Sequence, residues 1–185
     1  MKLHLIQPQE LYGPEEREAE LLYCWHQNAA IFDEVTAIDG RPTFKEMFAL
    51  CLPGYINVIA NSDIYFDHTL RDQAHKLHAN EVWALSRWDD KGGRNLFPYH
   101  RPDSQDAWIV RGGPWSVQAP YPMGIPGCDN AIAHVLRVMG LTVTNPCSKV
   151  RAIHLHLTEY RTYGGGRGKP KALTVPPPYQ WVYPC

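Results

Sequence analysis

The polar triplet Asn61-Ser62-Asp63 directly follows an apolar run of β-branched and aromatic residues, 55–60. Such a run is typical of a buried strand, and the triplet then lies where that strand leaves the sheet. In α/β folds this edge of a parallel sheet binds the ligands. A carboxylate there can hold Mg²⁺ or Mn²⁺ against a phosphate, because these cations prefer oxygen ligands. The alternative is a simple turn, which the same three residue types also favour.

Two histidines share one face of a predicted strand near the end of the chain. Over residues 150–158 the alternation of side chains puts His154 and His156 together, opposite the apolar residues Ile153, Leu155 and Leu157. Imidazoles at i and i+2 lie side by side and could bind a metal ion, whereas a single strand histidine is usually packed or exposed. A second pair, His75 and His78, has helical spacing without an HExxH pattern, so we expect it to face solvent.

A carboxylate and two guanidinium groups complete the set of polar candidates. Asp129 precedes an amphipathic run that predicts a helix ending at Gly140. On a rigid helix start its carboxylate can act as a general base at the ligand edge, or it can simply cap the helix. Arg87 and Arg111 could contact a phosphate, with surface salt bridges as the alternative.

Strands and short helices alternate along the chain that must position these groups. This alternation predicts βαβ crossovers and a largely parallel sheet. Two long polar loops, 89–103 and 112–126, are functional candidates, because such loops usually cover a site. The predicted strands are 2–7, 31–38, 55–60, 81–88, 107–111, 141–144 and 150–158, and the predicted helices follow Pro14, the Thr43-x-x-Glu46 capping box and Asp129, with another at 69–79.

The composition is that of an ordinary globular domain. The chain has 185 residues, 44% of them hydrophobic and 20% charged, with a net charge of −1, so neither disorder nor a strongly basic nucleic-acid binder is indicated. No apolar run approaches the ~20 residues that span a bilayer, and we expect a cytoplasmic protein without a membrane partner. Five cysteines without CxxC spacing argue against a disulfide framework or a zinc knot.

In their order and spacing these motifs resemble a small glycosyltransferase domain of the GT-A type. The resemblance covers about residues 1–163, with 164–185 as a Gly/Pro/aromatic tail. It implies a single-domain, Rossmann-like α/β fold whose mainly parallel sheet has an antiparallel edge and helices on both faces. The motifs are the Asn-Ser-Asp triplet, ALSRW (84–88), Ser104-Gln105-Asp106, GCDN (127–130), and HLH (154–156) followed by Arg161 and Tyr163.

The resemblance implies a nucleotide-diphosphate sugar, UDP-linked in our expectation, as donor and a divalent cation, Mn²⁺ or Mg²⁺, as cofactor. Asp63 would bind the cation together with His154 or His156. The donor would contact Asn61, Ser62, Asp63 and Arg87, and Arg87 or Arg111 could contact the acceptor. Asp129 would deprotonate the acceptor hydroxyl. The chain departs from the family's Asp-x-Asp pattern at Asn61, which removes one charge from the metal site, and it is short for the fold.

The composition of the predicted tail bears on the chemical class of the acceptor. Basic residues interleaved with glycines and aromatics could follow a phosphate backbone and stack on bases. The acceptor hydroxyl could therefore belong to a hydroxymethylated DNA base, as for some phage enzymes, or to a saccharide or small molecule. Alternatively, the prolines and aromatics of the tail pack back over the sheet. The basic residues are Arg161, Arg167, Lys169 and Lys171.

Two other classes of function fit the same residues. A metal-dependent hydrolase or nuclease would use Asp63, Asp129 and the histidines to activate water, with no need for a sugar nucleotide. A non-catalytic module would keep the fold and bind nucleotides or sugars through its aromatic residues.

Overall fold

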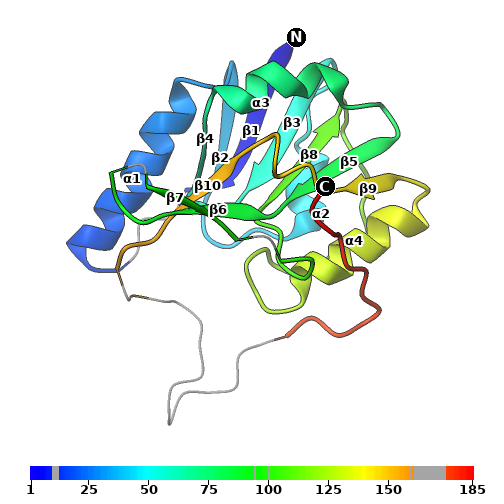
Figure 1. The fold of residues 1–185 in the computed structure, drawn as a ribbon. Coiled ribbons are helices and arrows are strands. Elements are labelled where there is room, and N and C mark those ends of the chain that lie inside the picture. Colours follow the sequence, from blue (N-terminus) through cyan, green and yellow to red (C-terminus); the bar gives the residue numbers. More distant parts are fainter. Residues whose placement is uncertain (10–12, 94, 100, 159, 161–173) are drawn as a thin grey trace.

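A computed structural model of the chain describes residues 1–9, 13–93, 95–99, 101–158, 160 and 174–185. Its centre is a six-stranded sheet in the order β2-β1-β3-β8-β5-β9 (Figure 1). Within this sheet β8 is antiparallel to both of its neighbours, and the other neighbouring strands pair in parallel. The strands are β1 (Lys2–Pro8), β2 (Glu34–Ile38), β3 (Tyr55–Ala60), β5 (Glu81–Leu85), β8 (Ala107–Arg111) and β9 (Thr142–Thr144).

The antiparallel strand lies inside the sheet, between β3 and β5, so its predicted place at the edge is wrong. Leu85 at the end of β5 pairs with Ala107 at the start of β8, which means that the chain re-enters the sheet at the end where it left. Since no crossover returns the chain to the opposite end, β8 must run antiparallel.

A second, four-stranded sheet has the order β4-β10-β6-β7. It consists of β4 (Ile64–Phe66), β10 (Ala152–Leu155), β6 (Arg87–Asp90) and β7 (Leu96–Pro98). The strand predicted over 81–88 is therefore divided between two sheets at Ser86. The buried Ser86 donates its N–H to Asn145 Oδ1 and its hydroxyl to the carbonyl oxygen of Arg101, which fixes the corner.

Helices cover both faces of the large sheet. The helices are α1 (Glu15–Ala29), α2 (Phe44–Ala49), α3 (His68–Gln73), which continues into the 3₁₀ turn η1 (Ala74–Lys76), and α4 (Cys128–Val138). On one face α2 and α4 bury Phe44 and Ile132 against Trp108 of β8. On the other face α3 joins the core of the strands, while α1 packs through Cys24 on the small sheet.

Several predicted elements are shorter than expected. The strand predicted from residue 31 begins at Glu34, and the helix predicted over 69–79 becomes α3 and η1. The predicted capping box is confirmed, because Thr43 Oγ1 accepts the Glu46 N–H and Glu46 Oε2 accepts the Thr43 N–H. The described cysteines are free.

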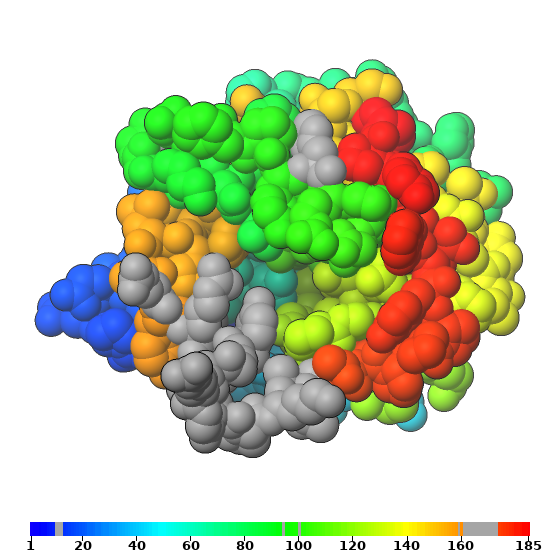
Figure 2. Space-filling model, turned by 60° about the horizontal axis from the view of Figure 1, so that its bottom comes forward, coloured from blue at the N-terminus to red at the C-terminus, as the bar shows by residue number. Residues whose placement is uncertain are grey.

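Residues 174–185, here called the C-terminal strap, pack against the body of the molecule. Val175 and Val182 are buried in the core that α2 and α4 share with the sheet. The strap runs past the loop before α4, as Figure 2 shows in red and orange. The predicted basic residues between 161 and 171, and Tyr163, lie outside the described residues. Among the described helices none is long and apolar enough to cross a membrane.

Candidate functional site

Asp63 is the centre of a compact polar cluster just after β3. Its Oδ2 lies 2.6 Å from Arg17 Nη2, 3.2 Å from His154 Nε2 and 3.7 Å from His156 Nδ1. Antiparallel pairing of β10 with β4 puts His154 opposite Ile64, the residue after Asp63. One ligand atom from each of Asp63, His154 and His156 lies within 4.8 Å of the other two, so the predicted metal ligands come together.

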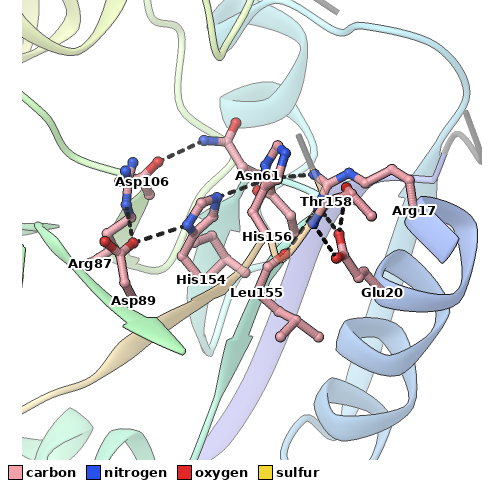
Figure 3. A network of polar contacts seen from close by, with 12 residues as sticks. Arg17, Glu20, Asn61, Arg87, Asp89, Asp106, His154, Leu155, His156 and Thr158 are labelled. Atoms are coloured by element: carbon pink, nitrogen blue, oxygen red, sulfur yellow. Dashed lines mark hydrogen bonds and ion pairs between the residues drawn. The ribbon is translucent and has the colours of Figure 1, made fainter. Parts of the chain in front are cut away.

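The second ring nitrogen of each histidine lies within hydrogen-bonding distance of an oxygen atom. His154 Nδ1 lies 3.1 Å from Asp89 Oδ1 (Figure 3), because parallel pairing puts His154 of β10 opposite Asp89 of β6. His156 Nε2 lies 2.8 Å from the carbonyl oxygen of Tyr160, which can only accept a hydrogen bond. In the neutral rings the nitrogens left to bind a metal are therefore His154 Nε2 and His156 Nδ1, the two that face Asp63.

The charges of the cluster are coupled. Burial lowers the pKa of His154, but Asp63 and Asp89 outweigh burial and raise it to about 9. Burial opposes ionisation of Asp63, but His154, His156 and Arg17 hold its pKa well below the usual range. At neutral pH His154 thus carries a proton that pairs with Asp63, and a metal ion would have to displace that proton.

Arg17 and Glu20 of α1 hold the cluster in place through hydrogen bonds and ion pairs. Arg17, only 1% exposed, donates from Nη1 to Glu20 Oε2 at 2.7 Å and to the carbonyl oxygen of Leu155 at 3.0 Å. Glu20 Oε1 accepts the N–H groups of Leu157 and Thr158, at 2.8 and 2.9 Å. The helix thereby holds both Asp63 and the chain that leaves β10.

A chain of ion pairs and hydrogen bonds leads away from His154. Asp89 Oδ1 lies 2.8 Å from Arg87 Nε, and Arg87 Nη1 lies 3.5 Å from Asp106 Oδ2. Asn61 Nδ2 donates to Asp106 Oδ1 at 3.2 Å, which closes the chain next to Asp63. Arg87 also lies over the ring of Tyr99, 4.2 Å from its centroid. A phosphate at Arg87 would compete with two carboxylates for the guanidinium group.

Asp129 lies at the far end of this chain, close to Asp106. It is in the first turn of α4, and the N-cap is Gly127 instead, so the capping alternative is wrong. Its carboxylate accepts the backbone N–H of Gln105 and lies 3.3 Å from Cys128 Sγ. Burial and then the charge of Asp106 raise the pKa of Asp129 to about 8, so its carboxyl group exchanges a proton near neutral pH.

The remaining predicted residues lie around or away from the cluster. Ser62 lines a small groove, partly open to solvent, which also includes Gln9 of the loop after β1 and Trp25 of α1. Arg111 lies at the opposite end of β8 and donates to the carbonyl oxygens of Leu77 and His75. His75 and His78 are exposed, as expected.

Four residues of the network were not predicted from the sequence as parts of the site: Arg17, Glu20, Asp89 and Asp106. A signal existed for the first two. Arg17 and Glu20 share helical spacing with the buried residues Leu21 and Cys24, so α1 carries two charged groups in its apolar stripe. Buried charges are normally paired, which predicts partners on another element.

Comparisons of the chain with protein-family models, with curated proteins and with solved structures give no significant match. The chemistry of the site therefore has to be inferred from its own side chains.

Proposed function

We propose that the protein is a metal-assisted glycosyltransferase of the GT-A type, which moves a sugar from a nucleotide-diphosphate sugar to an acceptor hydroxyl. The observation that carries the proposal is the orientation of the two histidines, whose outer nitrogens are bonded to oxygens while their inner nitrogens face Asp63. Carboxylate–histidine pairs of this kind orient metal ligands in enzymes. One carboxylate and two imidazoles suit Mn²⁺ better than Mg²⁺, which favours oxygen ligands.

The two ends of the network have different chemical roles in this proposal. When bound at Asp63, a cation would supply positive charge for the departing nucleoside diphosphate. At the other end Asp129, with a pKa of about 8, accepts the proton of the acceptor hydroxyl. The acceptor oxygen then bonds to the anomeric carbon as the bond between that carbon and the diphosphate oxygen breaks. Arg87 lies between Asp89 and Asp106 and limits the repulsion between the two ends.

The groove beside Ser62 is the proposed place of the nucleotide base. Trp25 and Leu22 line it together with Gln9, and it adjoins Ser62-Asp63, where the diphosphate would lie. An aromatic ring in such a groove can stack on the base, which is a common way to bind nucleotides.

Thermal unfolding with and without donor tests this function. We expect UDP-glucose or UDP with Mn²⁺ to raise Tm by roughly 5–10 °C at a hundredfold excess over Kd, because a ligand of the native state alone stabilises that state. GDP- and TDP-sugars, Mg²⁺ and Zn²⁺ serve as further arms. The absence of a shift with every nucleotide at millimolar concentration would contradict the proposal.

A matched pair of variants connects the shift to the site. Asp89→Asn should weaken Mn²⁺ binding by roughly 10–100-fold, because Asp89 orients His154. Asp103→Asn, which removes an exposed partner of Arg101, should bind Mn²⁺ as the natural protein does.

The role of Asp129 separates the transferase from the other functions. Asp129→Asn should abolish sugar transfer and leave nucleotide binding unchanged, because the carboxylate acts on the acceptor. A hydrolase would instead cleave bis(p-nitrophenyl) phosphate with metal alone and would lose that activity in the variant.

A further inference from the structure

Three aromatic rings stand exposed on one short segment. Tyr179, Trp181 and Tyr183 of the C-terminal strap are 42%, 52% and 65% exposed, while the intervening Val182 is only 2% exposed. These exposures place the three rings on the outer face of the strap and Val182 on its inner face. Water-exposed Trp and Tyr side chains that are not needed for packing are typical of binding surfaces.

The strap is firmly anchored without these rings. Its backbone N–H groups donate to carbonyl oxygens of the body at 2.9 Å each, from Gln180 to Asn130 and from Val182 to Pro102. The side chain of Val182 fills the core behind them. Folding of the strap therefore does not account for the outward rings of Trp181 and Tyr183, whereas the Tyr179 hydroxyl donates to the carbonyl oxygen of Val175. The backbone that carries the rings is already held in place, which lowers the entropic cost of binding.

The position of the strap connects the rings with the acceptor side of the site. Gln180 bonds to Asn130, the neighbour of the proposed base Asp129. The Tyr179 hydroxyl lies so close to Gly127, the N-cap of α4, that a Cβ atom there would come within 2.7 Å of it. Figure 2 shows the strap beside the loop before α4, on the face that is hollowed between that loop and the β10 segment.

The charge of the strap itself favours a neutral ligand. Residues 174–185 contain no lysine, arginine, aspartate or glutamate. The nearby Arg101 is paired with Asp103 at 2.6 Å. A nucleic-acid strand needs cations for its phosphates, and none is offered by this segment, whereas a neutral sugar ring needs only an aromatic face and hydrogen-bonding tips.

We infer that Tyr179, Trp181 and Tyr183 form the binding platform for a neutral saccharide, which is the acceptor of the proposed transferase. The identification of this saccharide as the acceptor rests on the proposed function, but binding of the saccharide can be measured by itself. Sugar rings would stack on Trp181 and Tyr183 and present a hydroxyl toward Asp129.

The test is binding of the full-length protein to an array of neutral and acidic oligosaccharides, with a single-stranded dT oligonucleotide as a separate arm. We expect binding to at least one neutral oligosaccharide, and a loss of at least tenfold in affinity in Trp181→Ala and in Tyr183→Ala. Phe97→Ala, which removes a 50% exposed ring from β7, is the matched control and should bind normally. Unchanged Tm values of the variants would show that they are folded.

The possible outcomes separate this inference from the proposed function. If no oligosaccharide binds, if Trp181→Ala and Tyr183→Ala bind as the natural protein does, or if these variants lose only DNA binding, the saccharide platform is wrong. If the platform binds saccharide but no nucleotide shifts Tm, the platform stands and the transferase proposal fails.

Discussion

Asp129 is held in an environment that opposes its charge. Burial and the neighbouring carboxylate of Asp106 raise its pKa, and the bonds from Cys128 and Gln105 with the charge of Arg87 offset only part of that effect. A carboxyl group of this kind costs stability whenever it ionises, and such groups gather at functional sites. The same property that suits it to take a proton near neutral pH should therefore be visible in the pH dependence of folding.

The stability of the natural protein should fall with rising pH between about 5 and 8, and Asp129→Asn should remove part of that fall. An aspartate in the unfolded chain has a pKa of about 3.9, against about 8 in the folded protein. Between these values the unfolded state loses the proton that the folded state keeps, which costs up to about 1.4 kcal/mol per pH unit. Urea unfolding at pH 5, 7 and 9 measures the effect.

The variant should gain stability relative to the natural protein up to about pH 8, and the gain should then level off. His154, whose pKa is also raised, loses its contribution as pH rises toward 9, but it does so in both proteins and cancels in the difference. Parallel stability profiles of the two proteins would show that Asp129 ionises as an ordinary exposed carboxylate does.

Residue types predicted the chemistry of the site better than its connections. Asp63, His154 and His156 could be named from their positions at strand ends and on one strand face. Asp89 could not, because its role depends on the register that puts β6 beside β10, between residues 65 positions apart. Register between distant strands is set by packing of the whole sheet, which a single sequence does not display.

At the scale of elements, α1 acts as a support for the metal-binding side of the site. Both terminal nitrogens of the Arg17 guanidinium group donate hydrogen bonds. Nη2 donates to Asp63, and Nη1 donates to Glu20 and to the carbonyl oxygen of Leu155. The helix therefore joins the end of β3 to the end of β10 through charged groups, where most helices use apolar ones alone. Removal of one member leaves a buried charge without its partner.

Arg17→Met should destabilise the protein by about 3 kcal/mol or more, because the buried Glu20 and the largely buried Asp63 would remain negatively charged without their partner. Met keeps most of the apolar stem, so the loss measures the guanidinium group rather than packing. The measurement is the free energy of unfolding in urea at pH 7.

Arg71→Met is the control, since the pair between Arg71 and Asp33 is exposed on both sides, and the cost there should stay below about 1 kcal/mol. Equal losses in the two variants would mean that Arg17 contributes no more than a surface ion pair does.

The order of strands and helices could be predicted, but the way they divide between sheets could not. Apolar runs identified β1, β3, β5 and β8, because strand signals are local. The break at Ser86 carries no such signal: EVWALSRW reads as one strand, and the corner exists because Asn145, from a distant segment, binds the Ser86 backbone. The antiparallel direction of β8 follows from the return of the chain to the sheet at the end where β5 left it.

At the scale of the molecule, the C-terminal strap joins parts that are far apart in the sequence. It bonds to the loop before α4 at Pro126, to the loop before β8 at Pro102 and to the segment after β9 at Asn145. These segments bound the Asp129 side of the site. The strap is thus expected to unfold together with the core, rather than to detach as a separate tail.

Val182→Ala should lower the free energy of unfolding by about 2 kcal/mol, because it removes two buried methyl groups and leaves a small cavity in the core shared by α2 and α4. Val138→Ala provides the contrast: this valine near the end of α4 is 73% exposed, and alanine is the better helix former, so no loss is expected. Urea unfolding followed by far-UV circular dichroism gives the two values.

Hydrogen exchange at the Val182 amide, which donates to the carbonyl oxygen of Pro102, measures the local stability of the strap. In an integrated strap this amide exchanges only through global unfolding, and Val182→Ala speeds its exchange by the same factor as that of amides in β3. Exchange that is fast in the natural protein, with a global stability unaffected by Val182→Ala, would mean that the strap opens independently of the core.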